Sequence, residues 1–123
     1  MIKTHSTIAE MVKYTTNTFL ATKVSFANEM KMICDELKID YDKVVEYSTY
    51  DERLGKSHWA VPGPDGKLGF GGSCFPKDLN ALIDLCYEKS IKANTLFGAW
   101  ETNLEVRPEQ DWKELKGRAV VDE

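Results

Sequence analysis

Residues 7–37, TIAEMVKYTTNTFLATKVSFANEMKMICDEL, contain neither proline nor glycine. Apolar side chains recur along this stretch at helical spacing, at Ile8, Met11, Val12, Phe19, Leu20, Val24, Phe26, Ala27, Met30, Ile33, Cys34 and Leu37. This spacing predicts one long amphipathic helix with a broad apolar stripe. Such a helix would extend roughly 45 Å, which is more than a domain of this size needs for its own core. We therefore expect the helix to pack against a partner or to link two domains.

The rest of the sequence predicts shorter helices around one long loop. Helical patterns resume over residues 42–47, 76–89 and 93–104, and either Asp40 or Asp42 would cap the first of these. Residues 49–73 lack a periodic pattern and include a cluster of turn residues, PGPDG, at 62–66. A long loop in a small domain is usually functional or disordered. The sequence therefore predicts an all-α domain built from one long amphipathic helix and several shorter helices.

The composition limits the class of protein. With 123 residues, of which 42% are hydrophobic, the chain can bury one core. It has 16 basic and 20 acidic residues and a formal charge of −4, so we expect no nucleic-acid partner and no anionic membrane surface. No apolar run approaches the ~20 residues of a membrane span, and the N-terminus has no leader pattern. We expect a cytoplasmic protein.

The three cysteines, Cys34, Cys74 and Cys86, are not spaced as metal ligands. Because the chain has only two histidines to join them, we expect no metal site. Cys34 and Cys86 lie among apolar residues at helical spacing and are expected to be core thiols. Three thiols cannot all pair, which indicates a reducing compartment with one thiol kept for chemistry.

Cys74 lies in the most distinctive part of the sequence, residues 69–78, GFGGSCFPKD. The preceding glycines allow backbone shapes and close approaches that a Cβ atom would prevent. Pro76 favours a first helical turn, so Cys74 should lie just outside a helix N-terminus, where free N–H groups favour a thiolate. Cys74 is then a candidate nucleophile. The alternative is an ordinary loop in which Cys74 fills a small buried gap.

Two polar residues of the long helix, Lys13 and Asn17, are four positions apart and project from one face. An ammonium group beside an amide can stabilise an oxygen that gains negative charge. The alternative is a solvated polar face. Asp78, four residues after Cys74, could serve the chemistry of the thiol, or it could be a favourable charge at a helix N-terminus, worth about 0.3–1 kcal/mol.

Three segments together resemble the nucleotide-sugar dehydrogenase family, whose members oxidise UDP-glucose, and sometimes GDP-mannose or UDP-N-acetylmannosamine, at C6. Residues 69–78 resemble the active-site signature of these enzymes. Residues 9–17, AEMVKYTTN, resemble the start of their central helix, and residues 51–55, DERLG, resemble their Asp-x-Arg-(Ile/Leu)-Gly element. The resemblance implies an all-helical central domain, like the C-terminal domain of 6-phosphogluconate dehydrogenase, that forms a homodimer through the long helix. It also implies NAD as the cofactor and a nucleotide sugar as the substrate.

The resemblance also implies roles for individual residues. Cys74 would add to the aldehyde produced by a first oxidation, and a thiohemiacetal, a second oxidation and a thioester would follow. Lys13 and Asn17 would face the reacting C6, and Asp78 would activate or place the hydrolytic water. Further contacts would come from the backbone of Gly69, Phe70 and Gly71 along the sugar nucleotide, from Arg53 to the substrate of the other subunit, and from Lys77 near the nicotinamide. Without the resemblance, Arg53 could equally be a surface arginine.

The resemblance covers residues 7–103 and, more weakly, 115–121. It implies a helical catalytic and dimerisation domain over residues 1–107, followed over 108–123 by a linker and the first strand of a UDP-binding domain. No G-x-G-x-x-G spacing of an NAD-binding fold is found, so we expect a fragment that lacks the NAD-binding domain and is inactive alone. Two alternatives remain, namely a dehydrogenase of another nucleotide sugar and a non-catalytic helical dimerisation module.

Overall fold

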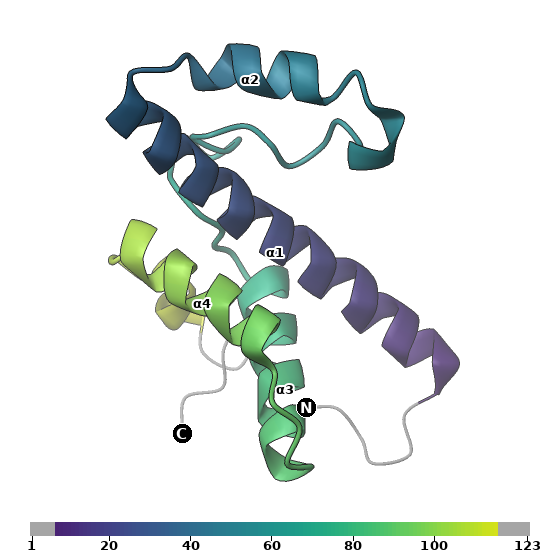
Figure 1. Ribbon diagram of the computed structural model, residues 1–123. Coiled ribbons are helices and arrows are strands. Elements are labelled where there is room, and N and C mark those ends of the chain that lie inside the picture. The colour runs from purple at the N-terminus through teal and green to yellow at the C-terminus, as the bar shows by residue number, and fades with distance from the viewer. Residues whose placement is uncertain (1–6, 116–123) are drawn as a thin grey trace.

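The computed structural model describes residues 7–115, and all the regular structure in that range is helical (Figure 1). Its elements are α1 at Ile8–Leu37, α2 at Tyr41–Ser48, η1 at Glu52–Leu54, α3 at Cys74–Glu88, α4 at Asn94–Val106 and η2 at Asp111–Leu115, where η marks a short 3-10 helix. The predicted all-α fold is confirmed, and the α-helices end within two residues of their predicted bounds. Of the strand expected over residues 115–121, only Leu115 is described, and it ends η2.

The ends of α1 follow from local chemistry. At its start, Thr7 Oγ1 accepts a hydrogen bond from the backbone N–H of Glu10, and the Glu10 carboxylate accepts one from the N–H of Thr7. This reciprocal capping box satisfies two N–H groups that the helix leaves free. At the other end, Lys38 takes a left-handed conformation with φ 58°, which stops the helix. Asp40 then caps α2 through the N–H groups of Asp42 and Lys43, so Asp40 rather than Asp42 is the cap.

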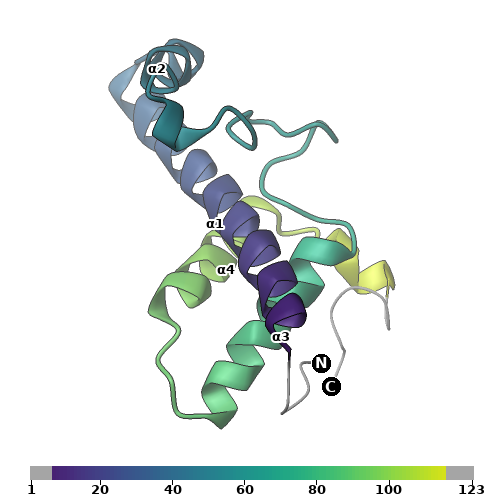
Figure 2. The same ribbon diagram turned by 90° about the vertical axis from the view of Figure 1, so that its right-hand side faces the viewer.

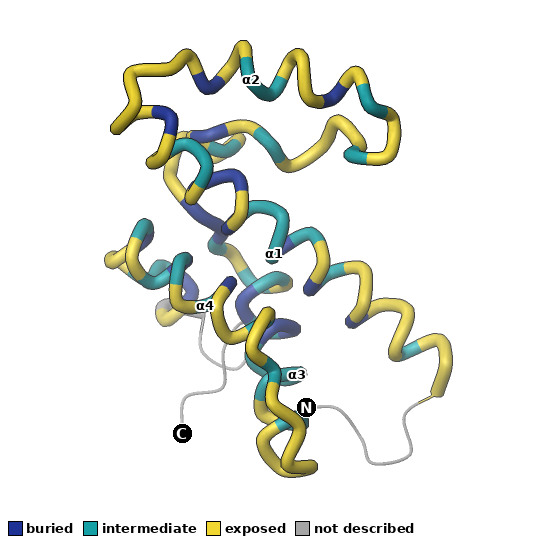
Figure 3. Tube along the Cα trace, viewed as in Figure 1, coloured by how far each residue is buried: buried dark blue, intermediate teal, exposed yellow. Residues whose placement is uncertain are grey.

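One side of α1 packs against α3 and α4, as Figures 1 and 2 show from two directions. The centre of this contact is a cluster of the buried residues Ala21, Phe70, Leu79 and Ala99. Small residues on α1 let α4 approach closely, and Ser25 Oγ donates to the carbonyl of Ala99 at 2.7 Å. In Figure 3, the buried positions of α1 follow this side of the helix. The long helix therefore serves as the platform for the other elements.

A second core lies at the C-terminal end of α1, where α2 and the long loop cover it. It consists of the buried residues Ala27, Cys34, Tyr41 and Val61. The Tyr41 hydroxyl donates to the carbonyl of Trp59 at 2.6 Å and thereby ties the loop to α2. Cys34 is a core thiol as predicted, whereas Cys86 is only half-buried.

The segment that follows α4 also packs on the helical body. Trp112 of η2 is 1% exposed, and its ring centroid lies 5.0 Å from that of Trp100 on α4. None of the described helices is both long enough and apolar enough to cross a membrane.

Candidate active site

Cys74 is the first residue of α3 and is exposed, which contradicts the alternative of a thiol that fills a buried gap. Pro76 is the third residue of the helix, a position in the first turn where the missing N–H of a proline is tolerated. The helix can therefore begin at Cys74, two residues before the proline. Cys74 therefore lies within the first turn rather than just outside it. Ser73 occupies the N-cap position without a capping bond from its side chain, and its Oγ lies 4.0 Å from Cys74 Sγ. The N–H groups of this turn favour an anion beside them.

A polar pair that includes Asp78, one turn after Cys74, joins two helices. Asn17 Nδ2 on α1 donates to Asp78 Oδ2 on α3 at 2.6 Å. Asp78 is fully buried, and its other oxygen, Oδ1, has no hydrogen-bond partner. A buried carboxylate oxygen without a partner is uncommon, because its desolvation is not compensated. Asp78 is therefore only half satisfied by the contacts of the fold.

The two lysines predicted for the site are less tightly held. Lys13 lies one turn before Asn17 on the same face of α1 and is exposed. Its ammonium nitrogen lies 5.5 Å from the centroid of the Tyr14 ring. Lys77 is half-buried in the first turn of α3. The structure thus brings Asn17 and Asp78 into direct contact and leaves the ammonium of Lys13 on the surface one turn away.

The glycine-rich loop before Cys74 is held by asparagine side chains. Asn28 Oδ1 accepts from the N–H of Gly69 at 3.1 Å. Asn103 on α4 bonds both polar groups of Phe70: its Oδ1 accepts from the N–H at 2.7 Å, and its Nδ2 donates to the carbonyl at 3.0 Å. Asn28 and Asn103 are both buried. Each asparagine therefore replaces a backbone partner for a loop that belongs to no sheet.

A buried arginine completes this support. Arg107, 1% exposed, donates through Nε to the carbonyl of Leu68 at 2.8 Å and through Nη2 to the carbonyl of Gly69 at 3.3 Å. Its charge is balanced by Asp65, at 2.8 Å, and Asp111, at 3.1 Å. Although burial alone raises the pKa of Asp65, hydrogen bonds from the Lys67 N–H and from Arg107 bring that pKa below its ordinary value.

Sequence reasoning did not identify Asn28, Asn103 and Arg107. One signal was available: Ala99 and Asn103 on α4 and Arg107, which follows its last residue, recur at intervals of four, and all three are buried. Polar residues in register with a buried alanine indicate a helix face that bonds backbone groups of another segment.

Two of the loop glycines leave no room for a side chain. A Cβ on Gly69, which also has φ +69°, would overlap Asn103 Oδ1. A Cβ on Gly71 would overlap Arg107 Nη1 and lie 2.6 Å from both carboxylate oxygens of Asp111. The predicted requirement for close backbone approach is thus met at these positions by contacts within the chain.

Arg53 lies on η1, which follows α2. Its side chain is 88% exposed and makes two hydrogen bonds with the carboxylate of Asp51, through Nε at 3.0 Å and through Nη2 at 2.7 Å. The guanidinium holds the pKa of Asp51 below its ordinary value. Lys23 on α1 donates to the carbonyl of Leu54 at 2.8 Å and so ties this turn to the long helix.

The described residues offer little to a metal or a dinucleotide. No group of three or more His, Cys, Asp or Glu side chains among residues 7–113 is arranged to hold a metal ion. A dinucleotide is usually held by a strand, a glycine turn and a helix, and residues 7–115 contain no such unit. These residues therefore do not fit NAD as its main binding site.

Comparison with known proteins adds a family context. The family model described as "UDP-glucose/GDP-mannose dehydrogenase family, central domain" matches residues 7–105. The UDP-glucose 6-dehydrogenase TuaD of Bacillus subtilis is 38% identical over 107 residues, which are 87% of this chain and 22% of that protein. The UDP-glucose 6-dehydrogenase AglM of Haloferax volcanii is 35% identical over 122 residues, which are 99% of this chain and 27% of that protein.

A solved structure agrees with these matches. A UDP-glucose dehydrogenase from the hyperthermophilic archaeon Pyrobaculum islandicum superposes with a TM-score of 0.72 at 38% sequence identity, over 82% of this chain and 22% of that one. The chain thus spans about a fifth to a quarter of the length of these relatives.

Proposed function

The chain belongs to the UDP-glucose/GDP-mannose dehydrogenase family, and on that basis we propose that it is the central domain of an enzyme that oxidises C6 of UDP-glucose. The overall reaction would consume UDP-glucose, two NAD and one water and would give UDP-glucuronate. In the whole enzyme, NAD would accept a hydride in each of the two oxidations. The residues of this chain would supply the nucleophile and the groups that handle oxygen and water.

The single observation that carries the proposal is the arrangement at the start of α3. An exposed thiol, Cys74, is the first residue of the helix, and Asp78 lies one turn later with one buried oxygen free and the other bonded to Asn17. A thiol that served only packing would have no need of an exposed position at a helix N-terminus. A carboxylate that served only packing would have both oxygens satisfied.

In the proposed chemistry, Cys74 is the nucleophile, and Lys13 and Asn17 stabilise the charge that develops on oxygen. The Cys74 thiolate attacks the carbonyl carbon of the C6 aldehyde and forms a C–S bond, while the carbonyl oxygen gains a negative charge that Lys13 and Asn17 stabilise. Protonation of that oxygen gives a thiohemiacetal. Its oxidation, with loss of a hydride from C6 and of the hydroxyl proton, gives a thioester. Water then attacks the thioester carbon, the C–S bond breaks, and the acid and the thiolate are released.

We assign the last step to Asp78. Its Oδ1 is buried and has no partner within the chain, so an attacking water that reached it in the whole enzyme would give it a hydrogen bond or a proton. Asn17, which donates one N–H of Nδ2 to the other oxygen, would fix the carboxylate, and the second N–H of Nδ2 would be the donor to the oxyanion. We assign Lys77 to the vicinity of the nicotinamide, on the resemblance of residues 69–78.

The proposed substrate contacts lie on two surfaces. The backbone of Gly69, Phe70 and Gly71 would run along the sugar nucleotide close to Cys74. On the resemblance of residues 51–55, Arg53 would act on the substrate of a second subunit, and its exposed guanidinium is already oriented by Asp51. A planar guanidinium suits this role, since it can bond sugar or phosphate oxygens in pairs.

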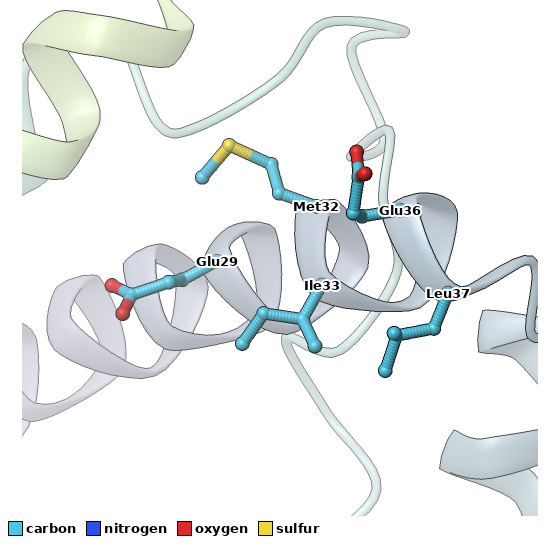
Figure 4. Close-up of a pocket in the computed structure, with 5 residues that line it drawn as sticks. All are labelled: Glu29, Met32, Ile33, Glu36 and Leu37. Carbon is cyan, nitrogen blue, oxygen red and sulfur yellow. The ribbon is translucent and has the colours of Figure 1, made fainter.

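We propose a homodimer formed through α1. An exposed apolar stripe runs the length of this helix at intervals of four and seven residues, through Ile8, Val12, Phe19, Phe26, Ile33 and Leu37. Figure 4 shows Ile33 and Leu37 projecting to the same side of α1, whereas Met32 and Glu36 project to the other side. This spacing is that of helices that pack along a common seam. A second copy presents the same stripe and would cover it.

Cys74→Ser in the whole enzyme tests the proposed dehydrogenase function. We expect loss of acid formation, since a serine at this position lacks the nucleophilicity of a thiolate. The matched control is Cys86→Ser, a half-buried thiol on the same helix, which should retain activity. Normal acid output from Cys74→Ser would contradict the thioester route.

The nucleotide sugar is decided by a parallel assay. UDP-glucose, GDP-mannose and UDP-N-acetylmannosamine are offered to the unaltered enzyme at equal concentrations. We expect the largest kcat/KM for UDP-glucose, because the relatives compared above are named for it. A larger value for either of the other two sugars would transfer the proposal to that substrate and leave the role of Cys74 intact.

A further inference from the structure

The glycine-rich loop is a segment that cannot hold its own shape. Gly69 and Gly72 both take positive φ values, +69° and +76°, and glycines lose more conformational freedom on ordering than other residues. The helix that follows does not fix the loop either, because Ser73 makes no capping bond from its side chain. The path of the chain into Cys74 must therefore be set from outside the loop.

The external support comes from one face of α4 and the residue that follows it. Asn103 bonds both the N–H and the carbonyl of Phe70, so a rotation of the loop at Phe70 breaks two bonds at once. Arg107 bonds the carbonyls of Leu68 and Gly69. Three consecutive residues of the loop are thereby tied to two buried side chains that lie one helical turn apart.

We infer that Asn103 and Arg107 are positioning residues for the thiol: they fix the backbone from Leu68 to Phe70, and through it the first turn of α3 on which Cys74 lies. Neither residue reaches the reacting atoms in this inference. The consequence for chemistry rests on the proposed function, in which Cys74 is an activated nucleophile. The positioning itself concerns the loop and can be measured without turnover.

The charge on Arg107 is part of the arrangement. A buried guanidinium requires compensation, and it is supplied by Asp65 from the long loop and by Asp111 from η2. The two carboxylates bring both flanking segments to the same point. Lysine could keep the positive charge but not the planar set of donors. Arg107→Lys therefore tests whether the loop depends on the geometry of the donors and not on the charge alone.

The test uses the whole chain and two measurements. Amide hydrogen exchange is followed at Gly69 and Phe70, whose N–H groups donate to Asn28 and Asn103. Alkylation by iodoacetamide is followed by mass spectrometry as the ratio of the Cys74 rate to the Cys86 rate. The variants are Asn103→Ala, which removes the acceptor of the Phe70 N–H, and Arg107→Lys. Their matched controls are Asn94→Ala, exposed on the same helix, and Arg53→Lys, the exposed arginine that is also paired with an aspartate.

We expect exchange at Gly69 and Phe70 to become about three- to tenfold faster in both variants, the equivalent of one lost hydrogen bond. The alkylation ratio should fall about two- to fivefold, the range in which a helix N-terminus stabilises a neighbouring negative charge. Both controls should match the unaltered chain. Circular dichroism confirms that each variant is folded. If either fails to fold, Asp65→Asn replaces it. Asp65 is half exposed, and its substitution removes only one of the two ion-pair partners of Arg107.

Unchanged exchange at both amides in folded variants would overturn the inference. So would faster exchange with an unchanged alkylation ratio, because the loop would then be ordered by these residues without any effect on the thiol. A failure of the proposed function has a different signature: Cys74 of the unaltered chain would react no faster than N-acetylcysteine. In that case the exchange rates alone decide whether Asn103 and Arg107 position the loop.

Discussion

Asn17 and Asp78 form a 2.6 Å hydrogen bond that joins α1 to α3, and it leaves one oxygen of a fully buried carboxylate without a partner. Asp78 lies beyond the first turn of α3, so the helix N-terminus gives its charge little support, and the oxygen without a partner makes burial of the carboxylate unfavourable. The carboxylate therefore adds little to the stability of the fold. The free oxygen is therefore better explained by chemistry than by packing.

We therefore predict that Asp78→Asn changes the stability of the chain little but greatly lowers acid formation. Asparagine keeps the shape of the side chain and an oxygen that can accept from Asn17. We expect the free energy of unfolding of the chain to change by less than about 1 kcal/mol. Acid formation by the whole enzyme should fall about 100-fold or more, because a carboxamide cannot accept a proton from water. Urea denaturation and a steady-state assay measure the two effects.

The control for Asp78→Asn is Asp84→Asn, an exposed aspartate on the same helix. It should leave both quantities unchanged. A loss of stability in Asp78→Asn that accounts for the whole loss of activity would assign Asp78 to the fold and remove it from the site.

Gly71 and Gly98 form a matched pair for the crowding around the loop. A Cβ on Gly71 would overlap Arg107 Nη1, whereas a Cβ on Gly98, inside α4, would meet nothing within 4 Å. We expect Gly71→Ala to lower the free energy of unfolding by about 1–3 kcal/mol, because a buried ion pair must shift. Gly98→Ala should raise it by about 0.5–1 kcal/mol, as alanine favours a helix. Equal stability of the two variants in urea denaturation would contradict the crowding at Gly71.

The helices could be predicted from the sequence because their signals are local. The absence of glycine and proline and the spacing of apolar residues define α1, and an aspartate before the next pattern defines the start of α2. The start of α3 was harder to predict. A proline is tolerated anywhere in a first turn, so Pro76 alone does not indicate which residue begins the helix.

The candidate site could likewise be predicted only in part from the sequence. Cys74, Lys13, Asn17 and Asp78 could be selected from residue type, spacing and resemblance, and two of them, Asn17 and Asp78, are hydrogen-bonded to each other. The support of the loop could not be selected so easily, since Asn103 and Arg107 bond backbone groups more than thirty residues away in sequence. Periodicity reports which side of a helix is buried, but not which distant peptide group lies against it.

Tyr41 predicts a loss of stability in alkali. Burial, with smaller contributions from Asp42 and Cys34, raises the pKa of Tyr41 to about 12, whereas an unfolded tyrosine has a pKa of about 10. The unfolded chain therefore releases this proton first as the pH rises. The stabilising effect is complete below about pH 10 and is lost between about pH 10 and about pH 12. Urea denaturation across this range should show stability falling with pH.

Tyr41→Phe is the control for this effect. It should remove that part of the pH dependence and, at neutral pH, should lower the free energy of unfolding by about 1 kcal/mol through loss of the bond to the carbonyl of Trp59. If the slope with pH is the same in Tyr41→Phe and in the unaltered chain, then Tyr41 is not the group responsible.

The apolar stripe of α1 predicts how the chain associates. Phe19 on α1 and Phe97 on α4 are similarly exposed, at 63% and 53%, yet only Phe19 lies on the stripe that we propose is covered by a second copy. Phe19→Glu would place a carboxylate in the seam of both subunits, so we expect the Kd of the dimer to rise about 100-fold or more. Phe97→Glu should leave it unchanged. Sedimentation velocity over a range of concentrations measures both, and equal effects of the two substitutions, or a chain that is monomeric throughout, would remove α1 as the dimer interface.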